Sequence, residues 1–309
     1  MADSGSLPVV VAVDGSVDGE RALRWAAEAA RLRSVTLQVV HVWPYVTAHQ
    51  VAADDATGDP VLDELRAQPL ARSLPEAEFR SLSGLTGSQL PTLGDGAHLL
   101  VLGSRGRGGF AALLLGSNGL ACADRSACPV VVVPRPDRAG TRCDEDGERL
   151  PPDVPQVTLG LDASAGEPGA VGFALAEASR RGARLKIVSG YAWPERVPPV
   201  VAEGAVHAAT QREYERALDA RLADALAPYR ARYPEADVEV ELRNADAAGQ
   251  LVAASRDSDL VVVGRRRRLG PVAHAVLLHA ACPIAVVPEP PEQRGPRPRP
   301  AQSMPKAAG

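Results

Sequence analysis

Two groups of residues in the first half of the chain are suited to binding a phosphorylated ligand. The first is Asp14-Gly15-Ser16, which directly follows the apolar run VVVAV. The second begins at Gly103 and Gly106 and continues to Gly116-Ser117, with the spacing G-x2-G-x9-G-S. Glycines let backbone N–H groups approach an oxyanion, and a helix starting at Gly116-Ser117 would direct its N-terminal amides and dipole at phosphate. Asp14 would accept hydrogen bonds from ribose hydroxyls or an adenine amine.

Ordinary turns explain the same residues without a ligand. Glycines after strands often only form turns, and Asp before Gly-Ser is often an N-cap or an Asx-turn. Two better-known phosphate motifs are excluded. Residues 106–111 fit G-x-G-x-x-A, but a dinucleotide fold needs an acidic residue about 20 positions later, where this chain has only CPVVVVP. No Gly-Lys-Ser/Thr of a Walker A motif exists in the sequence.

The sequence contains no convincing catalytic or metal-binding constellation. His41 is expected to be an ordinary strand residue. Cys128 and Cys282 precede two equivalent strands, which fits packing better than nucleophilic chemistry. There is no C-x-x-C pair, so a thiolate zinc site is excluded. Three further histidines have no Ser or Cys partner at a recognisable motif spacing: His98, His274 and His279. We therefore predict no catalytic residue and no metal ligand.

The elements that must position these residues occur twice. VVVAVDGS at 9–16 returns as VTLGLDAS at 157–164, AHLLVLGSRG returns as SDLVVVGRRR, and ACPVVVVP returns as ACPIAVVP. The order is the same and the spacing between copies stays near 150 residues. Such self-similarity indicates one domain duplicated in tandem.

Within each copy, short apolar runs alternate with Ala-rich amphipathic segments. VVVAVD is continuously apolar, which is typical of a parallel strand covered on both faces, and Asp18 is expected to cap the helix that runs on to Arg33. Further strands are expected in VTLQVVHVW, AEFRSLSG, HLLVLG and PVVVVP. Strands separated by helices imply right-handed βαβ crossovers. We predict an α/β fold with two tandem five-stranded parallel doubly wound sheets, whose ligands bind at the carboxyl ends of the strands.

Composition sets the domain limits and the setting. We place one domain at 1–135, a polar linker at 136–155, a second domain at 156–289 and a disordered Pro-rich tail at 290–309. The 45% hydrophobic and 23% charged residues are typical of a soluble globular protein, and a net charge of −4 gives no general attraction to nucleic acid or anionic membrane. No apolar run approaches the roughly 18 residues of a membrane span, and no signal peptide is evident, so we expect a cytoplasmic protein.

These motifs together resemble the universal stress protein family in its tandem form. The Asp after the first strand, the G-x2-G-x9-G-S element and the closing CPVVVVP strand carry the resemblance, which spans residues 8–288. It implies a sheet like that of the adenine nucleotide alpha hydrolases and ATP as ligand, with or without Mg²⁺. On this resemblance Asp14, with Gly15 and Ser16, would meet adenine or ribose, and Val42 would offer backbone contacts to adenine. The ribose and phosphates would be held by Gly103, Gly106, Gly116 and Ser117.

The second copy departs from this pattern. Asp162 and Gly264 remain, but Arg267 stands in the place of Gly106, and the following loop is seven residues shorter and lacks the Gly-Ser pair. The run Arg265–Arg268 is either an electrostatic anion site or a solvated basic turn. We therefore predict one ATP per chain, bound by the first half.

The resemblance implies an ATP-binding regulator of the stress response rather than a dedicated catalyst. Two other functions stay open: slow ATP hydrolysis or transfer of an adenylyl or phosphoryl group, and a nucleotide-independent scaffold. Family members pair through their fifth strands, so Val130 to Val133 and Ile284 to Val287 are expected to pair as an intramolecular pseudo-dimer. Further homodimerisation stays open.

Overall fold

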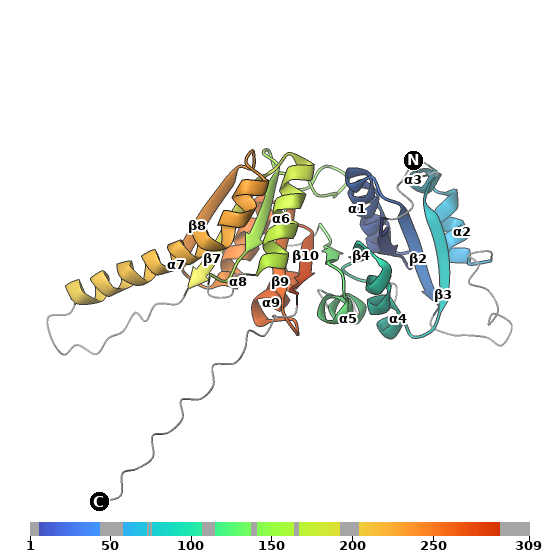
Figure 1. Ribbon diagram of the computed structural model, residues 1–309. Helices are drawn as coiled ribbons and strands as arrows, with labels where there is room; N and C mark the ends of the chain where they lie inside the picture. The colour runs from blue at the N-terminus through green and yellow to red at the C-terminus, as the bar shows by residue number, and fades with distance from the viewer. Residues whose placement is uncertain are drawn as a thin grey trace, which may run out of the picture.

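The computed structural model describes residues 6–43, 58–72, 74, 76–106, 115–136, 141–163, 167–191 and 204–290, and its strands and helices alternate along the chain (Figure 1). The strands are β1 (Val9–Ala12), β2 (Leu37–Trp43), β3 (Glu78–Ser83), β4 (Leu99–Gly103), β5 (Val130–Val133), β6 (Gln156–Gly160), β7 (Arg184–Tyr191), β8 (Val238–Asn244), β9 (Leu260–Arg265) and β10 (Ile284–Pro288). The α-helices are α1 (Val17–Arg33), α2 (Pro60–Ala67), α3 (Pro69–Arg72), α4 (Thr86–Thr92), α5 (Ser117–Arg125), α6 (Pro168–Arg181), α7 (Gly204–Arg232), α8 (Ala247–Ala254) and α9 (Pro271–His279). Short 3₁₀ turns cover Leu93–Gly96 and Ser255–Asp257.

These strands form one sheet of ten, in the order β3-β2-β1-β4-β5-β10-β9-β6-β7-β8. Neighbouring strands are parallel except β5 and β10, which run antiparallel with Val131 opposite Ala285. The predicted α/β fold is confirmed, with five parallel strands in each half. The predicted fifth-strand pairing also occurs within the chain, and it joins the two predicted sheets into one.

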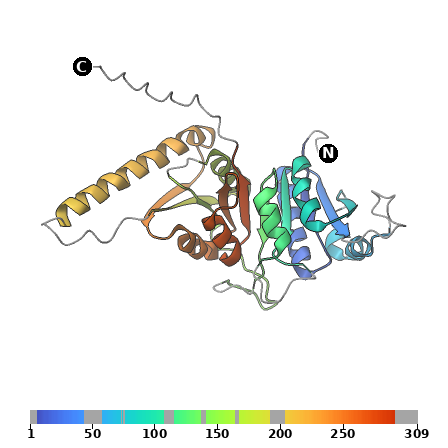
Figure 2. The ribbon, with the colours of Figure 1, turned by 90° about the horizontal axis from the view of Figure 1, so that it is seen from below.

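Helices cover both faces of the sheet and give it two cores. Alternate residues of β1 point to opposite faces: Val9 and Val11 belong to the core that includes residues of α1, α2, α6 and α7, whereas Val10 belongs to the core that includes residues of α4, α5, α8 and α9. Both cores continue across the β5–β10 junction. This two-sided burial explains why the strands are continuously apolar. Helix α7 projects from the body of the second half (Figure 2). Within the described ranges no helix is long and apolar enough to cross a membrane.

Helix α1 is capped differently from the prediction. The Oγ of Ser16 accepts a hydrogen bond from the Gly19 N–H at 3.1 Å, so Ser16 is the N-cap. The predicted capping by Asp18 is wrong, because that residue lies in the first helical turn and its carboxylate is buried. The Ser16 hydroxyl, one residue before the helix, accepts from the unpaired N–H of Gly19. The Asp18 carboxylate is therefore not needed as a cap and contacts other residues.

The described part of the predicted linker folds into a small hairpin. Residues 141–155 contain a turn closed by a bridge between Cys143 and Arg149. Glu148 forms ion pairs with two arginines of α1, and Arg149 donates a 2.6 Å hydrogen bond to the carbonyl of Ser258. The connection is therefore anchored to both halves. The predicted disordered tail lies, beyond residue 290, outside the described residues.

A buried ion cluster joins α1 to α6. The side chain of Glu177 is fully buried and pairs with Arg33 at the end of α1, with Arg180 at 2.8 Å and with Arg181 at 3.5 Å. Arg33 and Arg181 are the last residues of their helices, so they occupy equivalent places in the two halves. Burial lowers the pKa of Arg33 to about 10. One carboxylate thus holds three cations at the junction.

Two members of the predicted basic cluster also bind across the junction. Arg265 is buried and donates to the backbone carbonyls of Asp124 and Ser126, at the end of α5. Arg268 pairs with the Asp124 carboxylate at 2.7 Å. The same carboxylate accepts a hydrogen bond from the Leu269 N–H at 2.9 Å. Burial opposes ionisation of Asp124, but these contacts hold its pKa below the ordinary value. Both arginines therefore contact the first half, but only Arg265 is buried, whereas Arg268 is 79% exposed, as the solvated turn predicts.

Candidate nucleotide site

Asp14 and Gly106 come together at the carboxyl ends of β1 and β4. The Oδ1 of Asp14 accepts from the backbone N–H of Ser16 at 3.1 Å and from its hydroxyl at 2.5 Å. Gly15 has a φ of +73°, a left-handed conformation that glycine adopts without strain. A β-carbon built on Gly106 would lie 2.5 Å from the Oδ2 of Asp14. The Asp14 carboxylate therefore faces the bare backbone of Gly106.

Gly103 has a packing role of its own. A β-carbon at this position would lie 2.6 Å from the carbonyl oxygen of Asp18 and 2.7 Å from its carbonyl carbon. The end of β4 thus packs directly on the first turn of α1, and only glycine allows this approach. The predicted contact between Gly103 and a ligand stays a prediction.

Gly116 and Ser117 begin α5 beside the end of β4. The Gly116 N–H donates to the carbonyl of Ser104 at 2.8 Å, which ties the helix start to the residue after β4. Gly116 is the N-cap, and no side chain of the described residues caps this N-terminus. Residues 107–114, the middle of the predicted loop, lie outside the described residues. The phosphate role of Gly116 and Ser117 stays a prediction.

Val42 lies near the carboxyl end of β2, between β1 and β3. Val40 is level with Ala12 of β1, and Val42 follows two residues later, opposite Leu82 of β3. Its side chain is buried, so only its backbone groups would be available to a ligand at this edge. Residues 44–57, which follow β2, lie outside the described residues. The adenine contact of Val42 stays a prediction.

A buried carboxylate braces this site, and the sequence reasoning missed it. Asp18 is 2% exposed and pairs with the Nε of Arg135 at 2.9 Å and the Nη1 of Arg21 at 3.1 Å. The hydroxyl of Ser104 lies 3.4 Å from the same carboxylate. Arg135 is the second residue after β5, so this network ties α1, β4 and β5 together. In the sequence, only the position of Arg135 just after a buried strand indicates such a network, and it does not show that Asp18 is the partner.

A second buried network lies between β2, β3 and α2. The Asp59 carboxylate contacts the Nδ1 of His41 at 2.7 Å, accepts from the Ser81 hydroxyl at 2.7 Å, and caps α2 by accepting from the N–H of Val61 at 3.0 Å and of Leu62 at 3.2 Å. Burial would raise the pKa of Asp59, but the hydrogen bonds from Ser81 and His41 hold it below the ordinary value. The carboxylate, not the imidazole, lies between the other two groups. His41 therefore cannot take the Ser81 proton as a catalytic base would, and the network anchors α2.

In the second half, carboxylates lie beside the carboxyl ends of β9 and β10. Glu289 follows β10 and accepts hydrogen bonds from the N–H groups of Gly169 and Ala170 at 2.8 Å, so it occupies the N-terminus of α6. A β-carbon built on Gly264 would lie 2.9 Å from the carboxyl group of Glu167. Helix α9 begins with Gly270-Pro271, where α5 has Gly116-Ser117, and Pro at the first position has neither an N–H nor a hydroxyl. These residues disfavour a phosphate here.

The carboxylates of the second half should make stability depend on pH. Burial, with the neighbouring Glu289 and Asp162, raises the pKa of Glu167 to about 7 from its ordinary 4.5. The folded state then holds a proton more tightly than the unfolded state, so stability falls as the pH rises from about 4.5 to about 7. Glu167→Gln should therefore raise the free energy of unfolding, relative to the native chain, increasingly as the pH rises through this window. The gain should reach at most about 3.5 kcal/mol, at about 1.4 kcal/mol per pKa unit.

Thermal unfolding of the Glu167→Gln variant and the native chain over this pH window measures the effect. Glu213→Gln, a change at an exposed glutamate of α7, is the matched control and should show no such trend. A stability difference that stays constant with pH would contradict the proton on Glu167.

The described residues contain no group of three or more His, Cys, Asp or Glu side chains placed to hold a metal ion.

Comparison with known sequences agrees with the resemblance. The model of the universal stress protein family matches twice, over residues 7–134 and 155–288. Universal stress protein Rv2005c of Mycobacterium tuberculosis is 33% identical over 302 residues, which cover 90% of this chain and 96% of that protein. A universal stress protein of Mycolicibacterium smegmatis is 30% identical over 317 residues, again 90% of this chain and 96% of that protein. Both relatives align with this chain over almost their full length.

Solved structures share the fold. A universal stress protein from Archaeoglobus fulgidus aligns with a TM-score of 0.60 and 16% identity, covering 92% of this chain and 96% of that chain. The functionally unknown protein PA1789 from Pseudomonas aeruginosa aligns with a TM-score of 0.59 and 14% identity, covering 91% and 92%. At these identities the likeness concerns the fold alone.

Proposed function

Because this chain belongs to the universal stress protein family, we propose that it is an ATP-binding regulator with one nucleotide site, in its first half. The domains are residues 1–135 and 156–289, joined by the segment between them. The observation that carries the proposal is the approach of Gly106 to Asp14, where a β-carbon would lie 2.5 Å from the carboxylate. A carboxylate facing bare backbone at the carboxyl edge of a parallel sheet suits a nucleoside.

The ligand's parts match the groups at this edge. Asp14, steadied by Gly15 and Ser16, would accept from ribose hydroxyls or the adenine amine, and the backbone of Val42 would meet adenine. The loop after Gly103 and Gly106 and the α5 start at Gly116 and Ser117 would hold the phosphates through N–H groups, the helix dipole and the Ser117 hydroxyl. Because the described residues provide no metal cluster, any Mg²⁺ would arrive bound to the phosphates.

Toward ATP, the second half contributes structure rather than ligand contacts. Glu167 and Glu289 bring negative charge to the edge where phosphates would sit, and like charges at short range cost several kcal/mol of affinity. Its role is to pair with the first half through β10.

Calorimetric titration of ATP tests the assignment. We expect one site per chain, a more than tenfold loss of affinity (about 1.4 kcal/mol) in Asp14→Ala, and native affinity in the matched control Asp162→Ala. Two similar sites, or loss of binding only in Asp162→Ala, would show that the site is in the wrong half.

The same samples separate regulation from catalysis. Nucleotide released by heating the purified protein and identified by chromatography should be ATP that persists with time. Accumulating ADP would instead support slow hydrolysis, and no bound nucleotide after addition of ATP would support a scaffold.

A further inference from the structure

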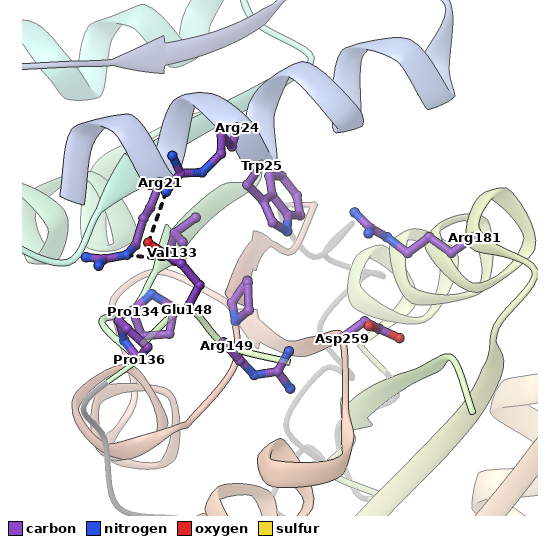
Figure 3. A pocket seen from close by; sticks show the side chains of 11 residues that line it. Arg21, Arg24, Trp25, Val133, Pro134, Pro136, Glu148, Arg149, Arg181 and Asp259 are labelled. Carbon is purple, nitrogen blue, oxygen red and sulfur yellow. Dashed lines mark hydrogen bonds and ion pairs between the residues drawn. The ribbon is translucent and has the colours of Figure 1, made fainter. Parts of the chain in front are cut away.

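A cavity of about 340 Å³ lies at the junction of the two halves. Arg21, Arg24 and Trp25 of α1 line it from one side and Arg181 of α6 from the other, and the connecting hairpin adds Arg149 (Figure 3). None of its lining residues belongs to the proposed ATP site. The volume lies in the range of small-molecule pockets. Only the complete tandem chain, with its connection folded, has this cavity.

The lining carries an excess of positive charge. Four arginines face two carboxylates, Glu148 and Asp259. Glu148 is shared between Arg21 at 3.2 Å and Arg24 at 3.3 Å, and Asp259 accepts a hydrogen bond from the Gln156 N–H at 2.9 Å. Arg149 donates a hydrogen bond from its Nη2 to a backbone carbonyl. This satisfies one donor, but Arg149 forms no ion pair with the described residues, so its positive charge is not compensated there. The cavity therefore favours an anion.

Arg181 has donors without acceptors. Its Nε and Nη2 are buried and have no hydrogen-bond acceptor among the residues that the structure describes. Its nearest carboxylate, Glu177 at 3.5 Å, is shared with Arg33 and Arg180. Buried donors without acceptors are costly, and guanidinium groups pair especially well with phosphate and carboxylate. Both atoms are closed to solvent, so an oxyanion in the cavity would meet the remaining surface of this side chain, which is 15% exposed, and be attracted by its charge.

Trp25 of α1 offers an aromatic face to the cavity, opposite Arg181 of α6. The Arg181 guanidinium lies 5.1 Å from the ring centroid of Trp25, and the two side chains point toward one another in Figure 3. Three prolines and Val133 complete the apolar part of the lining.

We propose that the junction cavity binds a small organic oxyanion that carries a flat ring. The phosphate or carboxylate group would lie on Arg181 and its neighbouring arginines, and the ring would pack against Trp25 and the prolines. This site is separate from the proposed ATP site. A ligand held by both halves and by the hairpin would bind only the joined arrangement and would stabilise it by mass action.

Trp25 makes the site observable. The chain contains three tryptophans, so replacing Trp43 and Trp193 with Phe leaves Trp25 as the only indole reporter. The full chain is titrated with phenyl phosphate, with benzoate and with phenol while Trp25 fluorescence is recorded. We expect saturable changes with one or both of the anions, which identifies the preferred acid group, and none with phenol.

Variants of the lining decide the assignment. Arg181→Met and Arg24→Met should each weaken the anion at least tenfold, whereas Arg31→Met, at an exposed arginine of the same helix, should not. Asp14→Ala should leave the titration unchanged. Arg24 is half exposed and contacts only Glu148 among the ion pairs, so its variant remains informative if Arg181→Met fails to fold. No saturable change through the millimolar range, an equal response to phenol, or loss in Asp14→Ala would overturn the proposal.

Discussion

Replacing Glu177 with Ala should lower the free energy of unfolding by about 3 to 5 kcal/mol, the usual cost of breaking a buried ion pair. Glu177 is fully buried and pairs with three arginines, and Arg33 is 2% exposed. Without the carboxylate, Arg33 would be a buried charge with no counterion. The loss should fall on the junction, because Arg33 belongs to α1 and Glu177 to α6. Urea denaturation followed by circular dichroism measures it.

A solvent-exposed ion pair provides the comparison. Glu28 pairs with Arg31 on α1 at 2.7 Å, but both side chains are largely exposed. Glu28→Ala should therefore change stability by less than about 1 kcal/mol. A Glu177→Ala variant no less stable than Glu28→Ala would mean that the junction does not depend on the buried cluster.

Substituting Gly106 with Leu should weaken ATP binding more than tenfold, or about 1.4 kcal/mol, while the chain stays folded. The new β-carbon would lie 2.5 Å from the Oδ2 of Asp14, so the loop or the carboxylate must move. Asp14 is held on its other oxygen by Ser16, and the substitution would therefore displace backbone from the proposed phosphate path. Calorimetry with ATP gives the affinity, and circular dichroism checks the fold.

Gly96 is a suitable control in the same half. A β-carbon there would meet no atom within 4 Å, so Gly96→Leu should bind ATP as the native chain does. Equal affinity in Gly106→Leu and Gly96→Leu would remove Gly106 from the binding site.

The α/β fold and the pairing of the two halves could be predicted from the sequence. Strands covered on both faces must be apolar throughout, so the runs VVVAV and VVVV predict parallel strands. The repeat then implies the second half without further information. The fifth-strand junction followed from the resemblance, and the register of Val131 with Ala285 confirms it.

Contacts between side chains far apart in the chain could not be predicted. Asp18 looked like a helix cap because local spacing is all that a sequence shows, yet its partner Arg135 lies 117 residues away. Arg265 looked like part of a basic turn, but its acceptors are carbonyls of α5 that come beside it only after β5 and β10 pair. The predicted ligand residues Asp14, Gly103 and Gly106 were easier to group, since each lies at or just after the carboxyl end of a strand at the same edge of the sheet.

The antiparallel junction also changes how assembly depends on concentration. Two separate chains that meet through fifth strands come apart on dilution, whereas a tethered partner is present at an effective concentration on the order of millimolar. Here β10 is always beside β5, so this edge is closed however scarce the protein is. The sheet's remaining borders are β3 and β8, which carry charged side chains such as Glu78 and Glu239. Charged borders oppose strand addition, and the dimer-like sheet itself forms within one chain whatever the protein concentration.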